Sequence, residues 1–121
     1  MSKDPMCYLD APDLTRLDLA AVLVDEVLGH LPYLVGSVLT TPDYRDVDVR
    51  AIMPDDRFDE LFKGVGRDSL RDLIEVALSE HFVRNTGLNV DFQIQRRTDS
   101  QKYEGARHPL GLYPRPSTGD E

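Results

Sequence analysis

The sequence predicts an α+β fold, a small mixed β-sheet of three to four strands with helices packed on one face. Two kinds of apolar pattern support this prediction. Apolar residues recur at helical spacing through residues 13–28 and 69–85, and they alternate with polar residues through 46–53 and 88–95. A period near 3.6 indicates an amphipathic helix, whereas a period of 2 indicates a strand with one buried face. One domain therefore contains both kinds of element.

Composition excludes several classes of protein. A chain of 121 residues is long enough to bury a core as one domain. Its net charge of −8 argues against general DNA or RNA binding, although a local basic pocket remains compatible. The single Cys7 leaves no disulfide framework or cysteine zinc site. Because no signal peptide and no apolar run of about 20 residues is evident, we expect a cytoplasmic protein without a membrane partner.

The N-terminal part reads as a lead-in followed by a helix. Residues 1–12 are expected to be irregular, with prolines as breakers. Asp13 can cap a helix that ends at Gly29. Its predicted buried stripe is Leu14, Leu17, Ala20, Ala21, Val24, Val27 and Leu28.

A short strand and a tight connection come next. Residues 33–35 predict a strand that enters a turn at Gly36-Ser37, and Pro42-Asp43 has turn chemistry. The eight residues between Ser37 and Asp46 allow a hairpin or one helical turn, but no crossover helix.

Two later helices follow the second strand. A short helix after Pro54 buries Phe58, Leu61 and Phe62 and is expected to end at Gly64. Asp68-Ser69 opens a longer helix, which reaches about Asn85. Its predicted stripe is Leu70, Leu73, Ile74, Ala77, Leu78, His81 and Phe82, and on such a stripe a histidine is more often structural than catalytic.

We divide the chain into a lead-in (1–12), a domain (13–98) and a tail (99–121). The proline-containing tail is expected to lie extended against the domain, and residues from Arg115 onward are expected to be disordered.

Three aspartates are predicted on the polar face of the sheet. Asp46 and Asp48 share one face of their strand with Arg50, and Asp91 occupies the polar side of residues 88–95. Like charges one strand repeat apart repel each other, so stability alone does not explain them. A solvent-exposed polar face is the simpler alternative, but neither strand contains the lysines expected of a solubilising surface.

The combined pattern resembles the polymerase-beta-like superfamily of minimal nucleotidyltransferases. The matching segments are Val35-Gly36-Ser37, Asp46-Val47-Asp48-Val49 and Asp91 within Val90-Asp91-Phe92. The resemblance covers roughly residues 14–95. It implies a nucleotidyltransferase-like fold and a Mg²⁺-dependent enzyme that moves a nucleoside monophosphate from a nucleoside triphosphate such as ATP to a hydroxyl acceptor.

The resemblance also implies a role for each residue. Asp46, Asp48 and Asp91 would be catalytic and hold two Mg²⁺ or Mn²⁺ ions, and Asp91 could accept the proton of the attacking hydroxyl. Gly36 and Ser37 would contact the triphosphate. The arginine that commonly follows Gly-Ser in the family is absent, and Val38-Leu39-Thr40-Thr41 stands in its place. Arg45 is the preferred substitute, ahead of the other arginines considered: Arg50, Arg96 and Arg97.

Two other functions remain open at this point. A non-catalytic descendant would keep the fold and bind a nucleotide or metal. An interaction module, for example a toxin–antitoxin component, would use the acidic face for recognition. The acceptor (protein, RNA end or small molecule) cannot be read from the sequence, and neither can pairing with a second copy or a small partner protein.

Overall fold

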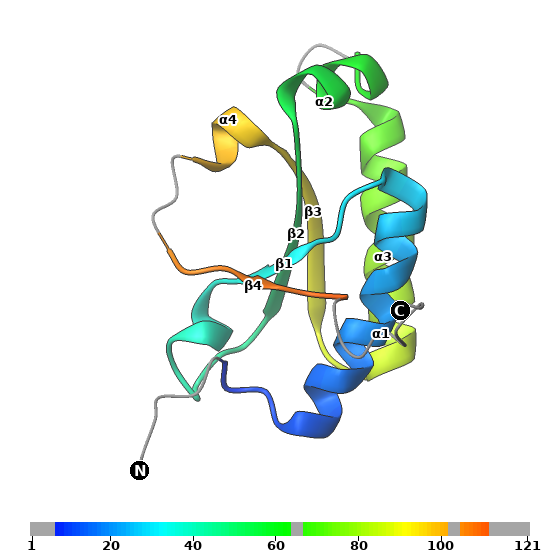
Figure 1. The fold of residues 1–121 in the computed structure, drawn as a ribbon. Helices are drawn as coiled ribbons and strands as arrows, with labels where there is room; N and C mark the ends of the chain where they lie inside the picture. The colour runs from blue at the N-terminus through cyan, green and yellow to red at the C-terminus, as the bar shows by residue number, and fades with distance from the viewer. Residues whose placement is uncertain (1–6, 64–66, 102–104, 112–121) are drawn as a thin grey trace, which may run out of the picture.

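The computed structural model describes residues 7–63, 67–101 and 105–111 (Figure 1). The elements in chain order are α1 (Ala11–Leu28), β1 (Tyr33–Val35), the 3₁₀ helix η1 (Ser37–Leu39), β2 (Val47–Met53), α2 (Asp55–Leu61), α3 (Ser69–Thr86), β3 (Val90–Arg96), α4 (Arg97–Ser100) and β4 (His108–Pro109).

The sheet is mixed and has four strands in the order β3-β2-β1-β4. β1 pairs antiparallel with β2 and β4, whereas β2 and β3 run parallel. Parallel neighbours need a crossover connection, and α2 and α3 supply it. The predicted α+β class with a small mixed sheet is therefore confirmed.

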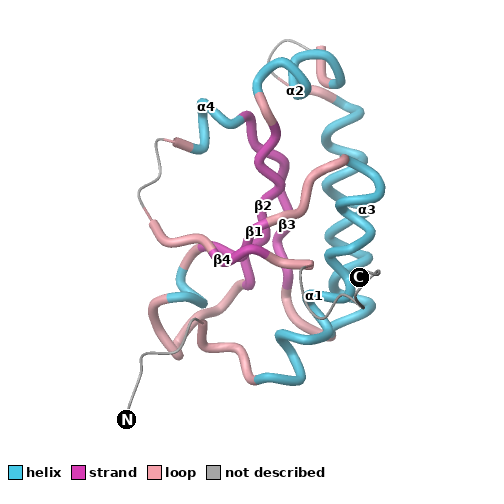
Figure 2. The backbone as a smooth tube through the Cα atoms, in the orientation of Figure 1, coloured by secondary structure: helices cyan, strands magenta, loops and turns pink. Residues whose placement is uncertain are grey.

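The two long helices form one layer. α1 and α3 lie side by side over one face of the sheet, and α4 lies on the opposite side (Figures 1 and 2). The core lies between this helical layer and the sheet, where Leu17, Val49, Phe82 and Phe92 are at most 1% exposed. His81 Nε2 lies 3.0 Å from the carbonyl oxygen of Ala20, so this histidine links α3 to α1 and has a structural role. The polar side chains of β2 and β3 lie on the opposite face of the sheet.

α1 begins three residues earlier than predicted. Asp10, not Asp13, is the N-cap, because its Oδ1 accepts a hydrogen bond of 2.9 Å from the Asp13 N–H. Pro12 is tolerated because the first helical turn needs no N–H from it. The predicted stop at Gly29 is confirmed, and Gly29 has a positive φ of 80°. Val27, assigned to the buried stripe, is instead 51% exposed.

The buried face of α3 also differs from the prediction. Leu78 and Phe82 are buried as expected, but Leu70 and Leu73 are 50% and 65% exposed. The residues of α3 that lie next to β3 include Glu75 and Ser79, which were not part of the predicted stripe. β3 is an edge strand, and the Glu75 carboxylate and the Ser79 hydroxyl accept hydrogen bonds from its otherwise unpaired N–H groups.

The tail contributes to the sheet. His108 and Pro109 form β4 beside β1, and Leu110 is fully buried. The positions expected to be disordered, from Arg115 onward, lie outside the described residues, and so does Gly64, although α2 already ends at Leu61. Among the helices of the described residues, none has the length and apolar character needed to cross a membrane.

Candidate active site

The polar face of β2 and β3 brings two of the predicted aspartates together. Asp48 and Asp91 are direct partners in the parallel register, and Arg50 is the partner of Gln93. The apolar residues between them point into the core, because alternate side chains lie on opposite faces of a strand. Asp48 and Asp91 therefore lie side by side on the face that the long helices leave open.

Asp46 takes a different position. It lies just before β2, is exposed, and its Oδ1 accepts a hydrogen bond of 2.6 Å from the side-chain amide of Asn89. The Asp46 carboxylate is therefore hydrogen-bonded to an amide, whereas Asp48 and Asp91 are paired with Arg50.

Arg50 places a guanidinium group between the paired carboxylates. Its Nη2 lies 3.3 Å from Asp91 Oδ2 and 3.7 Å from Asp48 Oδ1. Its Nη1 also donates a hydrogen bond of 2.7 Å to the backbone carbonyl of Asp91. Only 13% of the Arg50 side chain is exposed, and these contacts fix its position beside the two aspartates. The sequence placed Arg50 on this face but did not reveal that it would contact both carboxylates.

The electrostatic environment perturbs Asp48. Burial raises the pKa of its carboxyl group above the usual range, the Arg50 guanidinium opposes that rise, and the negative charges of Asp91 and Asp46 add to it. An ionised Asp48 is therefore only partly compensated by Arg50.

Gly36 lies against the Asp48 carboxylate. Its φ is 84°, and a Cβ atom built at this position would collide with Asp48 Oδ2. Two constraints thus favour glycine here, a backbone conformation that other residues rarely adopt and a close approach to the Asp48 side chain. Ser37 opens η1 directly afterwards; its side chain is exposed, and its carbonyl accepts hydrogen bonds from Thr40 and Thr41.

A hollow of about 260 Å³ lies over this part of the sheet. We call it the small hollow; its lining residues are Val35, Gly36, Asp48, Arg50, Ile52, Gln93, Gln95, Ser100, Gly105, Ala106 and Arg107. Arg107 donates a hydrogen bond of 3.0 Å to the carbonyl of Ser100. No sequence signal pointed to Arg107, because only the return of the chain toward β4 brings it here.

The other arginines weighed from the sequence lie elsewhere. Arg45 is exposed and does not line the small hollow, and neither does Ser37. Arg96 is bound to Asp55 and Asp59 of α2. Arg97 is exposed on α4. Arg50 and Arg107 are the cations that line the small hollow.

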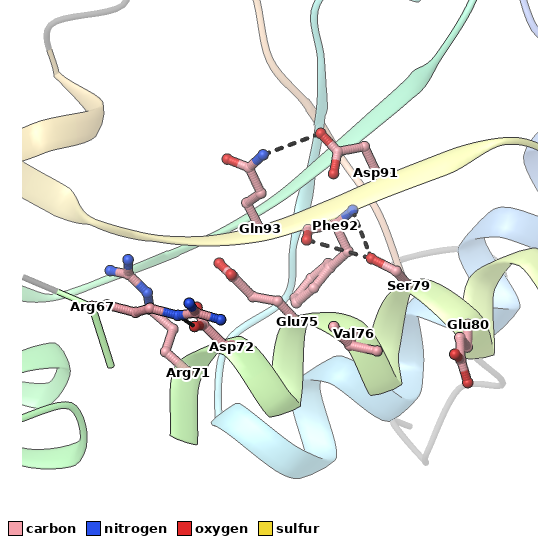
Figure 3. A pocket seen from close by; sticks show the side chains of 10 residues that line it. All are labelled: Arg67, Arg71, Asp72, Glu75, Val76, Ser79, Glu80, Asp91, Phe92 and Gln93. Atoms are coloured by element: carbon pink, nitrogen blue, oxygen red, sulfur yellow. Dashed lines mark hydrogen bonds and ion pairs between the residues drawn. The ribbon is translucent and has the colours of Figure 1, made fainter. Parts of the chain in front are cut away.

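A second and larger hollow of about 700 Å³ lies between α3 and the free edge of β3 (Figure 3). We call it the large hollow; its lining residues are Arg67, Arg71, Asp72, Glu75, Val76, Ser79, Glu80, Asp91, Phe92 and Gln93. Gln93 lines both hollows and donates a hydrogen bond of 3.1 Å to Asp91 Oδ2. Gln93 therefore connects the two hollows, whereas Asp91 lines only the large hollow.

The donor atoms at this site suit a hard cation. Carboxylate oxygens are the ligands that Mg²⁺ and Mn²⁺ prefer, and Asp48 and Asp91 already share a cationic partner in Arg50. Within residues 7–63, 67–101 and 105–111, no group of three or more His, Cys, Asp or Glu side chains is arranged to hold a metal ion. In the described residues the two neighbouring carboxylates on this face are those of Asp48 and Asp91, and the Arg50 guanidinium is their counter-charge.

No protein-family model, no curated protein and no solved structure matches the chain.

Proposed function

We propose that this protein is a Mg²⁺-dependent nucleotidyltransferase, which transfers a nucleoside monophosphate from a nucleoside triphosphate to a hydroxyl acceptor. One observation carries the proposal. Asp48 and Asp91 are paired across parallel strands, and the Gly36 backbone lies against Asp48 at the edge of a hollow. A pair of carboxylates beside a backbone turn without a Cβ is the arrangement that metal-assisted phosphoryl chemistry needs.

The small hollow is suited to the phosphate groups. Gly36 allows the backbone to approach them closely, and the Ser37 hydroxyl at the start of η1 lies one residue further along the chain. Arg50 and Arg107 line the hollow and supply two positive charges to a polyanion. In this proposal Arg107, rather than Arg45, takes the part of the missing arginine.

Asp48 and Asp91 would hold the metal ion, and Asp46 would contribute if its contact with Asn89 were released. When bound, Mg²⁺ or Mn²⁺ would supply charge neutralisation at the phosphates. Asp91 would have a further role, because its side chain is 48% exposed, lines the large hollow and accepts a hydrogen bond from Gln93, which lines both hollows. In this proposal Asp91 would accept the proton of the acceptor hydroxyl.

The decisive experiment is a label-transfer assay with the whole protein. Each nucleoside triphosphate, labelled at the α-phosphate, is incubated with the protein, Mg²⁺ or Mn²⁺ and a cell extract, and transferred label is measured. We expect transfer that is lost in Asp48→Asn and Asp91→Asn and kept in Asp43→Asn, a matched control in an exposed loop residue. Transfer that both site variants retain would refute the proposal.

A second candidate function is supported by Arg50. Because its guanidinium already contacts both Asp48 and Asp91 in place of a metal ion, the site could bind a nucleotide without catalysing transfer. Calorimetry combined with the label-transfer assay separates the two candidates, since a non-catalytic protein would bind a triphosphate and show no label transfer. A protein that binds no triphosphate even at millimolar concentration would contradict both candidates and leave the interaction module.

A further inference from the structure

The large hollow is placed on the acceptor side of the proposed reaction. Its lining includes Asp91 and Gln93, whereas Asp48 and Gly36 line the small hollow. Because Gln93 lines both hollows and Asp91 is the strand partner of Asp48, Asp91 would lie close to a nucleotide in the small hollow and to the occupant of the large hollow. We infer that the large hollow binds the acceptor, and that the acceptor is a hydroxyl-bearing basic peptide segment. This inference rests on the proposed function.

The shape of the large hollow fits an extended chain. α3 lines it from Arg71 to Glu80, which corresponds to about 14 Å of helix at 1.5 Å per residue. About four residues of extended peptide span that length. The volume of about 700 Å³ lies within the range of ligand sites, roughly 300–1,000 Å³.

The peptide would not add to the sheet as a further strand. The N–H groups of Phe92 and Ile94 at the free edge of β3 are already bound by Ser79 Oγ at 3.1 Å and Glu75 Oε2 at 2.7 Å. Strand addition would have to break both bonds. Recognition therefore depends on side chains, whose arrangement Figure 3 shows.

The charges of the large hollow select a cationic acceptor. Four carboxylates line it, and only two guanidinium groups do. Arg67 Nε is bound to Asp72 Oδ2 at 2.6 Å, and the Arg71 guanidinium packs over the Phe58 ring at 5.4 Å. Glu80 is exposed and Asp91 half exposed. Asp72 and Asp91 are paired with Arg67 and Arg50. Glu75 and Glu80 have no cationic partner among the ion pairs of the described residues, so their charges would attract lysine or arginine side chains and repel the phosphates of a nucleic-acid acceptor.

The transfer step balances with the groups named. The peptide hydroxyl gives its proton to the Asp91 carboxylate, and its oxygen forms a bond to the α-phosphorus. The bond from that phosphorus to the oxygen bridging the α- and β-phosphates breaks, and the leaving pyrophosphate takes the electron pair. The products are a nucleotidylated peptide and pyrophosphate.

The test measures peptide binding and transfer separately. One probe is a fluorescent peptide with Ser, Thr and Tyr flanked by lysines, and a second has glutamates in place of the lysines; RNA and DNA oligonucleotides with free 3′-hydroxyls are the third. We expect the whole protein to bind the lysine peptide by anisotropy and to label it. Glu80→Lys should weaken that affinity about fivefold, as expected for reversing one charge near the surface.

Glu26→Lys is the matched control, because it makes the same charge change at an exposed α1 position outside the large hollow. Its peptide affinity should equal that of the wild type. The inference is overturned if Glu26→Lys weakens binding as much as Glu80→Lys, if the two peptides bind equally, or if the oligonucleotides are labelled instead. In the last case the proposed function still stands, whereas absence of triphosphate binding by the wild type removes both.

Discussion

Replacing Arg50 by methionine tests whether this side chain occupies the position of a cation. Methionine keeps most of the apolar stem and removes the charge and the bond to the Asp91 carbonyl. The side chains of Arg50, Asp48 and Asp91 are 13%, 26% and 48% exposed. Breaking a fully buried pair costs about 3–5 kcal/mol and an exposed one about 0–1, so partial burial gives a loss of about 2 kcal/mol. The melting temperature should fall by about 5–10 °C.

Divalent ions should compensate for that loss. With Arg50 removed, Mg²⁺ or Mn²⁺ can approach Asp48 and Asp91 without displacing a guanidinium, and an ion at 100 times its Kd would add about 2.7 kcal/mol. Thermal and urea denaturation with and without the ion measure both effects. We expect a larger ion response in Arg50→Met than in the wild type, and none in the double variant with Asp48→Asn.

Arg97→Met is the matched control, since Arg97 is exposed on α4; it should leave both stability and ion response unchanged. An Arg50→Met protein that is as stable as the wild type and does not respond to ions would refute this account of the site.

Two further predictions concern Asp48 and Gly36. Because burial raises the pKa of Asp48 from its usual 3.8, stability from this group is present below that value and is lost as pH rises through the folded-state pKa. In urea denaturation, Asp48→Asn should therefore be more stable than the wild type at pH 7 and equal to it at pH 3; a variant less stable at pH 7 would contradict the sign. Gly36→Ala should lower the free energy of unfolding by about 1–3 kcal/mol, because φ is 84°. It should also abolish triphosphate binding in calorimetry, because its Cβ displaces the Asp48 carboxylate. Unchanged binding would show that the turn is not part of the site.

The face shared by Asp48 and Asp91 was predictable from sequence because the period of a strand is 2, so parity alone decides which side chains lie together. Their direct pairing was less accessible. It depends on β3 running parallel to β2 in this register, and parity does not determine register or strand direction. Asp46 shows the limit, since its parity is correct but it precedes β2 and contacts Asn89.

The burial of α3 was predicted less well for a different reason. The helical period of the apolar residues predicted that Leu70 and Leu73 would be buried, but both are exposed. Glu75 and Ser79 lie next to β3 because the N–H groups of an edge strand need acceptors. That requirement arises only from the order of the strands, so periodicity in one segment could not reveal it. Arg107 was missed for a similar reason, as its place depends on β4 joining β1.

The two cations of the small hollow suggest how nucleotide and metal would depend on each other under the proposed function. A triphosphate adds several negative charges beside Asp48 and Asp91, and Arg107 alone faces the hollow without a carboxylate partner among the ion pairs of the described residues. A divalent ion at the two aspartates would replace Arg50 as their counter-charge and leave its guanidinium available to the phosphates. Each ligand would then strengthen the binding of the other by the same factor, because coupling between binding sites is reciprocal. Under that function, Arg50 would be the residue through which a metal ion at the carboxylates affects phosphate binding.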